Sequence, residues 1–177
     1  MNTPIELPGG TLTMCDVKDF RDTLKPNHTV LTLCKYPPKY NESDKNECYH
    51  YYFRYHNADP EVWAIPVLMV HDLIIEGHDV LLHCVHGRDR TGGVAYAVLR
   101  LFGFNHETVC TMMQGARPKM HDEWNTILDE RRETHEAAYD VACQKIDDLP
   151  PCTAPPWWGT YFTQEQNSVK GIAFGSI

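Results

Sequence analysis

Short apolar segments alternate along this chain with longer segments whose apolar residues recur at helical spacing. Four short segments, residues 11–14, 29–34, 49–55 and 79–82, are rich in β-branched, aliphatic or aromatic side chains, which is typical of strands. Because strands alternate with helices, we expect an α/β fold with a mainly parallel central sheet flanked by helices. The longer segments predict helices at residues 16–24, from residue 60 or 66 to 76, at 92–102, at 106–114, and from about 122 onward.

Proline-rich segments separate or follow these elements. Residues 35–48 are polar and contain two prolines, which predicts a surface loop. A chain of 177 residues is long enough for one domain with a proper core, which we place at residues 1–148. Residues 149–177 form a tail that contains Pro and Trp. Two interpretations of the tail are open: a disordered segment that binds a partner, or a segment that packs Trp157 and Trp158 on the domain. We favour packing, because paired indole rings are costly to leave in water.

One predicted strand is joined to the next helix by the segment HCVHGRDRTG, residues 83–92. In α/β sheets, ligands bind at the carboxyl ends of the strands. A strand that turns directly into a helix also points backbone N–H groups and the positive end of the helix dipole at one place. The pattern therefore predicts an anion site in this loop.

Cys84 and Arg90 lie at the two ends of the loop and supply complementary chemistry. The helix N-terminus and Arg90 both favour the thiolate, which is the nucleophilic form of cysteine. Arg90 can hold two oxygens of an oxyanion in a bidentate fork, and the backbone N–H groups of residues 85–90 can bind the others. Thr91 is placed to donate a hydrogen bond to the sulfur, which would help it leave during hydrolysis of a phosphocysteine.

These residues resemble HCxxGxxR[ST], the signature of the cysteine-based protein tyrosine and dual-specificity phosphatase superfamily. The resemblance implies a dual-specificity phosphatase-like catalytic domain, a phosphocysteine intermediate and no cofactor. His83 is expected to position the cysteine through hydrogen bonds rather than to act as a base. The predicted substrate-binding residues are Val85, His86, Gly87, Arg88, Asp89, Arg90 and Arg117.

Arg117 belongs to this set because Arg117-Pro118 matches a loop that borders the active site in dual-specificity enzymes. The alternative interpretation is an ordinary surface arginine at the end of a helix.

The general acid has three alternatives. The superfamily usually protonates the leaving oxygen with an aspartate upstream of the cysteine, and Asp59 is the first candidate. Asp59-Pro60-Glu61 is equally a typical helix start, with Asp as the N-cap. Residues 34–57 resemble tensin-type lipid phosphatases, and that alignment places Tyr55 at the usual aspartate. Asp89 is the second candidate, because myotubularin-type lipid phosphatases carry an aspartate inside the loop, and the third alternative is that no aspartic acid takes part.

Cys34 matches a cysteine of the tensin-type phosphatases that can form a disulfide with the nucleophile. It falls at the end of a predicted strand that neighbours the strand before Cys84. Two interpretations follow: a reversible, protective disulfide between Cys34 and Cys84, or an inert thiol in the core.

The inner residues of the loop are also similar to HCTHGxNRTG, the version in metazoan and baculovirus RNA 5′-triphosphatases. Residues 114–118, QGARP, are similar to the QARP of those enzymes with one inserted glycine. The leaving group of an anhydride is already a stable phosphate, so such an enzyme can dispense with the acid. The departures are Asp89 in place of Asn and a net charge of −8, which speaks against a surface that coats nucleic acid.

The main expectation is therefore a phosphatase that acts on phosphotyrosine, and also on phosphoserine and phosphothreonine, in proteins. The alternatives are an RNA 5′-triphosphatase or diphosphatase, a phosphoinositide phosphatase and a non-catalytic phosphate-binding module. Lipid phosphatase loops tend to carry two lysines, where this loop has Val85 and Arg88. A non-catalytic relative usually loses the cysteine or the arginine, and both are present here.

Composition narrows the class of protein and its expected location in the cell. Hydrophobic residues make up 42% and charged residues 23% of the chain, which is ordinary for a globular protein. No apolar run reaches the ~18 residues of a membrane span, and the first residues lack the pattern of a signal peptide. We expect an intracellular protein, cytoplasmic or nuclear, which includes a viral protein acting in a host cell. The seven cysteines lack zinc-site spacings, so we expect reduced thiols and no metal.

Overall fold

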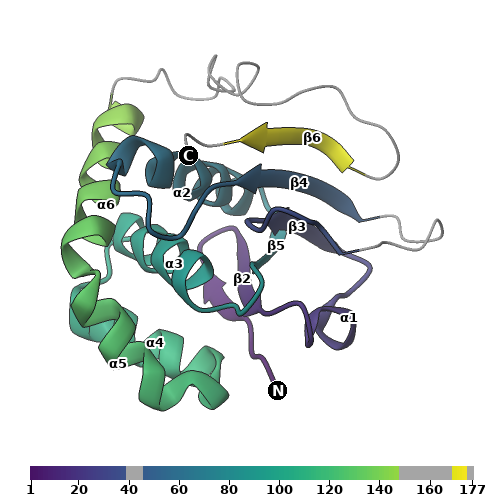
Figure 1. Ribbon diagram of the computed structural model, residues 1–177. Coiled ribbons are helices and arrows are strands. Elements are labelled where there is room, and N and C mark those ends of the chain that lie inside the picture. Colours follow the sequence, from purple (N-terminus) through teal and green to yellow (C-terminus); the bar gives the residue numbers. More distant parts are fainter. Residues whose placement is uncertain (39–45, 148–168, 175–177) are drawn as a thin grey trace.

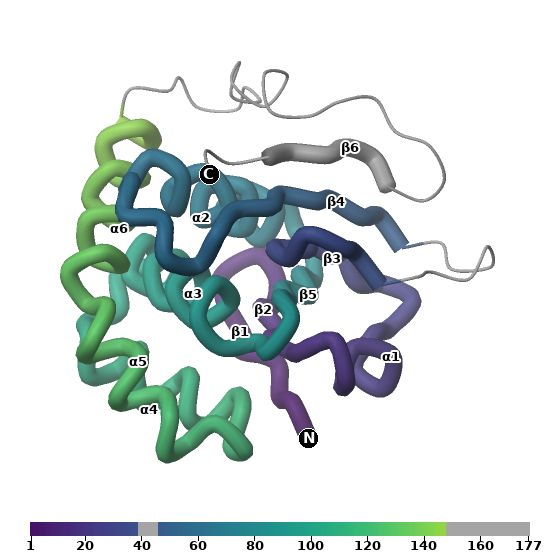
Figure 2. Tube along the Cα trace, in the orientation of Figure 1, coloured from purple at the N-terminus to yellow at the C-terminus, as the bar shows by residue number. Residues whose placement is uncertain are grey.

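A six-stranded sheet forms the centre of the computed structural model, which describes residues 1–38, 46–147 and 169–174 (Figures 1 and 2). The strand order is β1-β2-β5-β3-β4-β6. β1 pairs with β2 antiparallel, and the other neighbouring strands pair in parallel, which confirms the mainly parallel α/β sheet. The strands are β1 (Ile5–Leu7), β2 (Gly10–Cys15), β3 (His28–Thr32), β4 (Glu47–Tyr52), β5 (Asp79–His83) and β6 (Val169–Phe174).

Helices cover both faces of the sheet, but unequally. The long helices α2 and α3 pack on one face, and α6 lies on their far side (Figures 1 and 2). On the other face, Phe20 of the short helix α1 closes a small apolar cluster with Leu81 of β5 and Val30 of β3. The helices are α1 (Phe20–Thr23), α2 (Pro60–Ile75), α3 (Asp89–Leu101), α4 (His106–Ala116), the 3₁₀ turn η1 (Pro118–Met120), α5 (His121–Glu130) and α6 (Arg132–Asp147).

β5 lies between β2 and β3 inside the sheet, and its apolar sequence fits this position. Val80 and Leu82 belong to the large core under α2 and α3, while Leu81 faces α1. All three side chains are completely buried. A strand buried on both faces is apolar throughout instead of alternating, which is the pattern that predicted it.

The predicted helix at residues 16–24 is wrong in its first part. The Asp16 carboxylate accepts hydrogen bonds from the backbone N–H groups of Lys18 and Asp19, at 2.9 and 2.8 Å, and so forms a turn. The helix that follows, α1, has only four residues. Aspartate offers the backbone this alternative to helical hydrogen bonding, which explains the difference.

Of the two predicted starts for the helix that ends near residue 76, the structure has the earlier one. Asp59 is the N-cap, Pro60 occupies the first turn, and Pro66 lies inside the continuous helix α2. The charged helix expected from about residue 122 is two helices, α5 and α6, which meet at Arg131.

The tail was expected to pack on the domain through its tryptophans. Trp157 and Trp158 lie outside the described residues. β6, which the sequence analysis did not predict, comes from the same tail and pairs in parallel with β4 (Figure 1). No helix within the described residues is both long and apolar enough to cross a membrane.

Candidate active site

The loop after β5 has the predicted strand-loop-helix geometry. Cys84 follows the last residue of β5, and α3 begins at Asp89. Gly87 has a φ of +58°, the left-handed region that favours glycine. A Cβ at this position would lie 2.5 Å from the carbonyl oxygen of Cys15 on the neighbouring strand β2. Glycine is therefore needed at this position both for the backbone angle and for the close approach of the loop to β2.

A cavity of about 250 Å³ opens at this loop. It is lined by Tyr55, Cys84, Val85, His86, Arg88, Asp89 and Arg90. Cys84 lines the cavity although only 2% of the residue is exposed. Five of the seven predicted substrate-binding residues line the cavity, and Gly87 and Arg117 are not among its lining residues.

Arg90 is tied to the ends of two strands through one nitrogen. Its Nη1 donates to the carbonyl oxygens of Leu33, at 3.0 Å, and Phe53, at 3.1 Å. Leu33 follows β3 and Phe53 follows β4, so both strands end where their chains turn to hold the guanidinium. The Nε of Arg90 is buried and has no hydrogen-bond partner among the described residues. A buried donor without a partner is costly, and an oxyanion in the cavity would satisfy it.

His83 and Thr91 flank the loop and are both completely buried. The Nε2 of His83 lies 2.7 Å from the hydroxyl of Thr32. Burial lowers the pKa of His83 to about 3, which makes it a very weak base and favours the positioning role. The Thr91 hydroxyl has no hydrogen-bond partner within the described part of the chain, so its donation to the sulfur stays a prediction.

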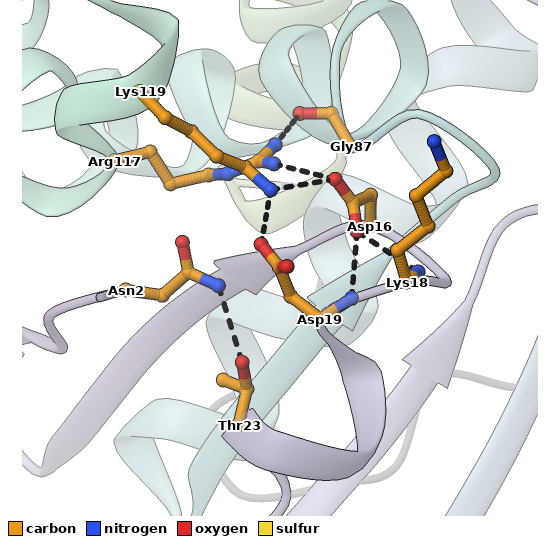
Figure 3. Close-up of polar contacts among 8 residues, drawn as sticks. All are labelled: Asn2, Asp16, Lys18, Asp19, Thr23, Gly87, Arg117 and Lys119. Carbon is orange, nitrogen blue, oxygen red and sulfur yellow. Dashed lines mark hydrogen bonds and ion pairs between the residues drawn. The ribbon is translucent and has the colours of Figure 1, made fainter.

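Arg117 contacts the main chain of the loop and links it to Asp16 (Figure 3). Its Nη1 donates to the carbonyl oxygen of Gly87, and its Nη2 donates to Asp16 Oδ2 at 3.1 Å. Lys119 Nζ donates to the same carboxylate oxygen at 2.8 Å and also pairs with Asp19. Burial alone would raise the pKa of Asp16, but hydrogen bonds from Lys119 and the Asp19 N–H, and the charges of Lys119 and Arg117, lower it overall.

This placement corrects both predictions for Arg117. The side chain is completely buried, so it is not a surface arginine. It also does not line the cavity; its guanidinium contacts the main chain of the loop at Gly87 instead of facing a substrate. The reason is the carboxylate of Asp16, which lies 101 positions earlier in the chain and is brought beside Arg117 only by the fold.

The two candidate acids are placed differently. Asp59 is exposed and accepts a hydrogen bond from the Glu61 N–H at 3.0 Å, which confirms its N-cap role, and it is not among the cavity-lining residues. Asp89 lines the cavity, but Arg88 Nε lies 3.2 Å and Arg131 Nε 3.6 Å from its carboxylate. The identity of the acid stays a prediction.

Arg131 is a site residue that the sequence analysis missed. From the junction of α5 and α6 it donates through Nη1 to the carbonyl oxygen of Tyr55 at 2.8 Å, and its guanidinium lies 5.2 Å from the centre of the Tyr55 ring. It also pairs with Asp89. Arg131 thus connects the loop after β4 to the loop after β5. These residues are 76 and 42 positions away from it in the chain, and no pattern in the sequence links them.

Two further thiols lie near Cys84. Cys34 is buried, and its sulfur donates to the carbonyl oxygen of Tyr36 at 3.3 Å. Burial raises the pKa of the Cys34 thiol, and the neighbouring Cys84 raises it further. Burial also raises the pKa of Cys15, at the end of β2, to about 12. Both are free cysteines in this structure, and the disulfide between Cys34 and Cys84 stays a prediction.

The class of this protein follows from a comparison with protein families. A model of the tyrosine phosphatase family matches residues 39–154, which is more than half of the chain. The chain belongs to this family, and it is a phosphoric monoester hydrolase, as the loop predicted.

Solved structures agree on the fold. Tk-PTP in its G95A mutant form is 19% identical with a TM-score of 0.54, and the match covers 83% of this chain and 98% of that chain. DUSP15 is also 19% identical with a TM-score of 0.54, and the match covers 86% of this chain and 100% of that chain. The comparison with curated proteins found no match.

Proposed function

We propose that this phosphatase hydrolyses phosphate esters of proteins through a phosphocysteine intermediate, with phosphotyrosine as a substrate and phosphoserine and phosphothreonine as further ones. The observation that carries the proposal is the state of Arg90. Its Nε is buried and has no hydrogen-bond partner among the described residues, and Arg90 lines the same cavity as Cys84. An oxyanion bound there would complete the hydrogen bonding of Arg90 and lie beside the nucleophile.

In the first step the Cys84 thiolate attacks phosphorus, the bond from phosphorus to the ester oxygen breaks, and the leaving oxygen takes a proton from the acid, Asp59 or Asp89, or from water where no aspartic acid takes part. The N-terminus of α3 and Arg90 are proposed to hold the equatorial oxygens in the transition state. In the second step water attacks phosphorus and gives a proton to the base left by the first step or to solvent, the bond from phosphorus to sulfur breaks, and phosphate leaves with Cys84 again a thiolate. Thr91 is proposed to donate to the departing sulfur, since its buried hydroxyl has no other partner among the described residues.

RNA 5′-triphosphate hydrolysis is the second candidate. One observation favours it: the upstream aspartate, Asp59, is not among the residues that line the cavity, and Tyr55 lines it instead. Hydrolysis of an anhydride does not need an acid, because its leaving group is a stable phosphate.

A side-by-side assay tests the proposal. Wild-type protein and Cys84→Ser are given a phosphotyrosine peptide, a 5′-triphosphorylated RNA and a phosphoinositide. We expect the wild type to have its highest kcat/KM on the peptide and Cys84→Ser to show only background release of phosphate. Arg90→Lys, which keeps the charge but loses the fork, should lower kcat by about 10²- to 10³-fold.

Three results would contradict the proposal. Turnover that survives in Cys84→Ser would remove the phosphocysteine step. A higher kcat/KM on RNA would make the second candidate the function. Phosphopeptide binding by the wild type without release of phosphate would indicate a phosphate-binding module.

A further inference from the structure

Large hydrophobic side chains are exposed at six positions in the described part of the chain, and four of them share one edge of the sheet. Val17 follows β2, Tyr36 follows β3, Tyr55 follows β4 and Val85 follows β5. Each therefore lies in the first loop beyond the carboxyl end of a parallel strand, which is the edge of the sheet where the cavity-lining loop after β5 begins. We call these four side chains the apolar collar.

The loops that carry the apolar collar border the cavity. Tyr55 and Val85 line the cavity themselves. The backbone N–H of Val17 donates to the carbonyl oxygen of Val85 at 3.2 Å, and Leu33, three positions before Tyr36, accepts from the cavity-lining Arg90 at 3.0 Å. The four residues are between 39% and 75% exposed. Single exposed apolar side chains are normal, but a group of them around a binding cavity marks an interaction surface.

Charges near the mouth of the cavity argue against a polyanionic partner. Arg88, which lines the cavity, pairs with Asp89 and lies 3.3 Å from Glu123. Beyond Val85, His86 and Arg88, a second cavity of about 380 Å³ is lined also by Met120, by one further cation, Lys18, and by the two carboxylates of Asp16 and Glu123. A nucleic acid strand or an anionic membrane surface is held by unpaired cations, whereas here a principal cation is already neutralised by carboxylates.

We propose that the apolar collar is the docking surface for a polypeptide substrate with apolar side chains next to its phosphorylated residue. The proposal rests on the proposed function, because the docked segment presents its phosphate to Cys84. It goes further in naming the chemistry of the flanking residues. Tyr55 and Val85 are placed to contact the phosphorylated residue itself, and Val17 and Tyr36 its neighbours.

Binding to the Cys84→Ser protein tests the docking separately from catalysis. Two phosphotyrosine peptides are compared by fluorescence anisotropy, one with Leu and Phe beside the phosphotyrosine and one with Ser at the same places. We expect the apolar-flanked peptide to bind at least tenfold more tightly. Tyr36→Ser or Val17→Ser, added to Cys84→Ser, should each reduce this preference by about threefold to tenfold, because each removes an apolar contact.

Ile75→Ser is the matched control, because Ile75 is an exposed apolar residue at the end of α2, outside the apolar collar. It should leave the preference within twofold. The docking proposal is wrong if the two peptides bind equally, if neither binds, if an acidic-flanked peptide binds more tightly, or if Ile75→Ser reduces the preference as much as Tyr36→Ser. Apolar preference in binding together with no turnover by the wild type would instead reject the proposed function and leave the docking surface.

Discussion

Different nitrogens of the Arg90 guanidinium serve the fold and the proposed reaction. Nη1 is used by two carbonyl groups at the ends of β3 and β4, which fixes the plane of the side chain. Nε is left buried without a partner among the described residues. A donor that is already positioned pays little entropy when it meets a phosphate, which is the condition for strong transition-state stabilisation.

The two candidate acids can be separated by paired substitutions. If Asp59 is the acid, Asp59→Asn should lower kcat on a phosphoserine peptide by about 10²-fold or more, with a smaller effect on an aryl phosphate whose leaving group is more stable. Asn can also cap a helix, so the stability of α2 should be little changed. The measurement is kcat for both substrates.

Asp89→Asn is the counterpart. Asp89 lines the cavity, and a larger loss of kcat in Asp89→Asn than in Asp59→Asn would assign the acid to Asp89. Equal activity of both variants and the wild type would mean that no aspartic acid takes part.

Arg117 is a positioning residue, because it acts on the loop through the carbonyl oxygen of Gly87 and does not line the cavity. In Arg117→Met the loop loses this contact, and a small misplacement of its N–H groups should lower kcat by up to about 10²-fold. KM for a small aryl phosphate should change less than kcat. The measurement is the split between kcat and KM, together with the melting temperature.

Lys119→Met is the control for this prediction. Lys119 shares Asp16 with Arg117 but is exposed and makes no hydrogen bond to Gly87. Its loss should leave kcat within about threefold. If Arg117→Met lowered the melting temperature but not kcat, the role of Arg117 would be structural only.

Among the elements, the junction of α5 and α6 matters for the site because its residue Arg131 connects two loops. Arg131 donates to the Tyr55 carbonyl oxygen and pairs with Asp89, so it holds the loop after β4 against the start of α3. Without it, we expect residues 54–58 to open more often. In Arg131→Met, hydrogen exchange at residues 54–58 should increase by about tenfold, and kcat/KM should fall.

Arg132→Met tests whether this effect belongs to the contact. Arg132 is the exposed neighbour in the sequence, and it lines a different cavity with Arg100 and Glu136. Exchange at residues 54–58 should be unchanged in this variant. A uniform increase of exchange over the whole protein in Arg131→Met would point to lower global stability instead.

At the scale of the whole molecule, buried histidines make stability depend on pH. Burial lowers the pKa of His83 to about 3 and that of His135 to about 4, below the ordinary value of 6.5. The unfolded chain therefore binds protons that the folded protein does not bind between these values. The free energy of unfolding should fall as pH falls from about 6.5 to 4, by roughly 1 kcal/mol per pH unit for each histidine.

Urea unfolding at pH 7, 6 and 5 measures this slope. His135 lies between Trp63 and Tyr96, with ring centres 5.5 and 5.9 Å away, so His135→Phe keeps an aromatic ring there and removes the titrating group. In this variant the free energy of unfolding should depend less steeply on pH, by the contribution of one histidine. The exposed His121, replaced by Gln, serves as the control, and an unchanged slope in His135→Phe would show that His135 does not contribute.

The order of elements was largely predictable, because it depends on local patterns. The apolar runs predicted β2, β3, β4 and β5, and helical spacing predicted α2, α3 and α4. β1 was missed because a strand of three residues carries almost no periodicity. The helix predicted to begin at Asp16 was wrong in its first part because the local pattern is ambiguous. An aspartate before an apolar residue is typical both of a helix N-cap and of a turn.

The loop around Cys84 shows where sequence and tertiary structure divide. A cysteine and an arginine at the two ends of a strand-to-helix turn could be predicted from the sequence, because ten consecutive residues carry that geometry. The fold was needed to establish which aspartate lines the cavity, that Arg117 is buried and contacts Gly87, and that Arg131 contacts Tyr55. These contacts join residues from different elements far apart in the chain, and hydrophobic periodicity carries information about neighbours along the chain alone.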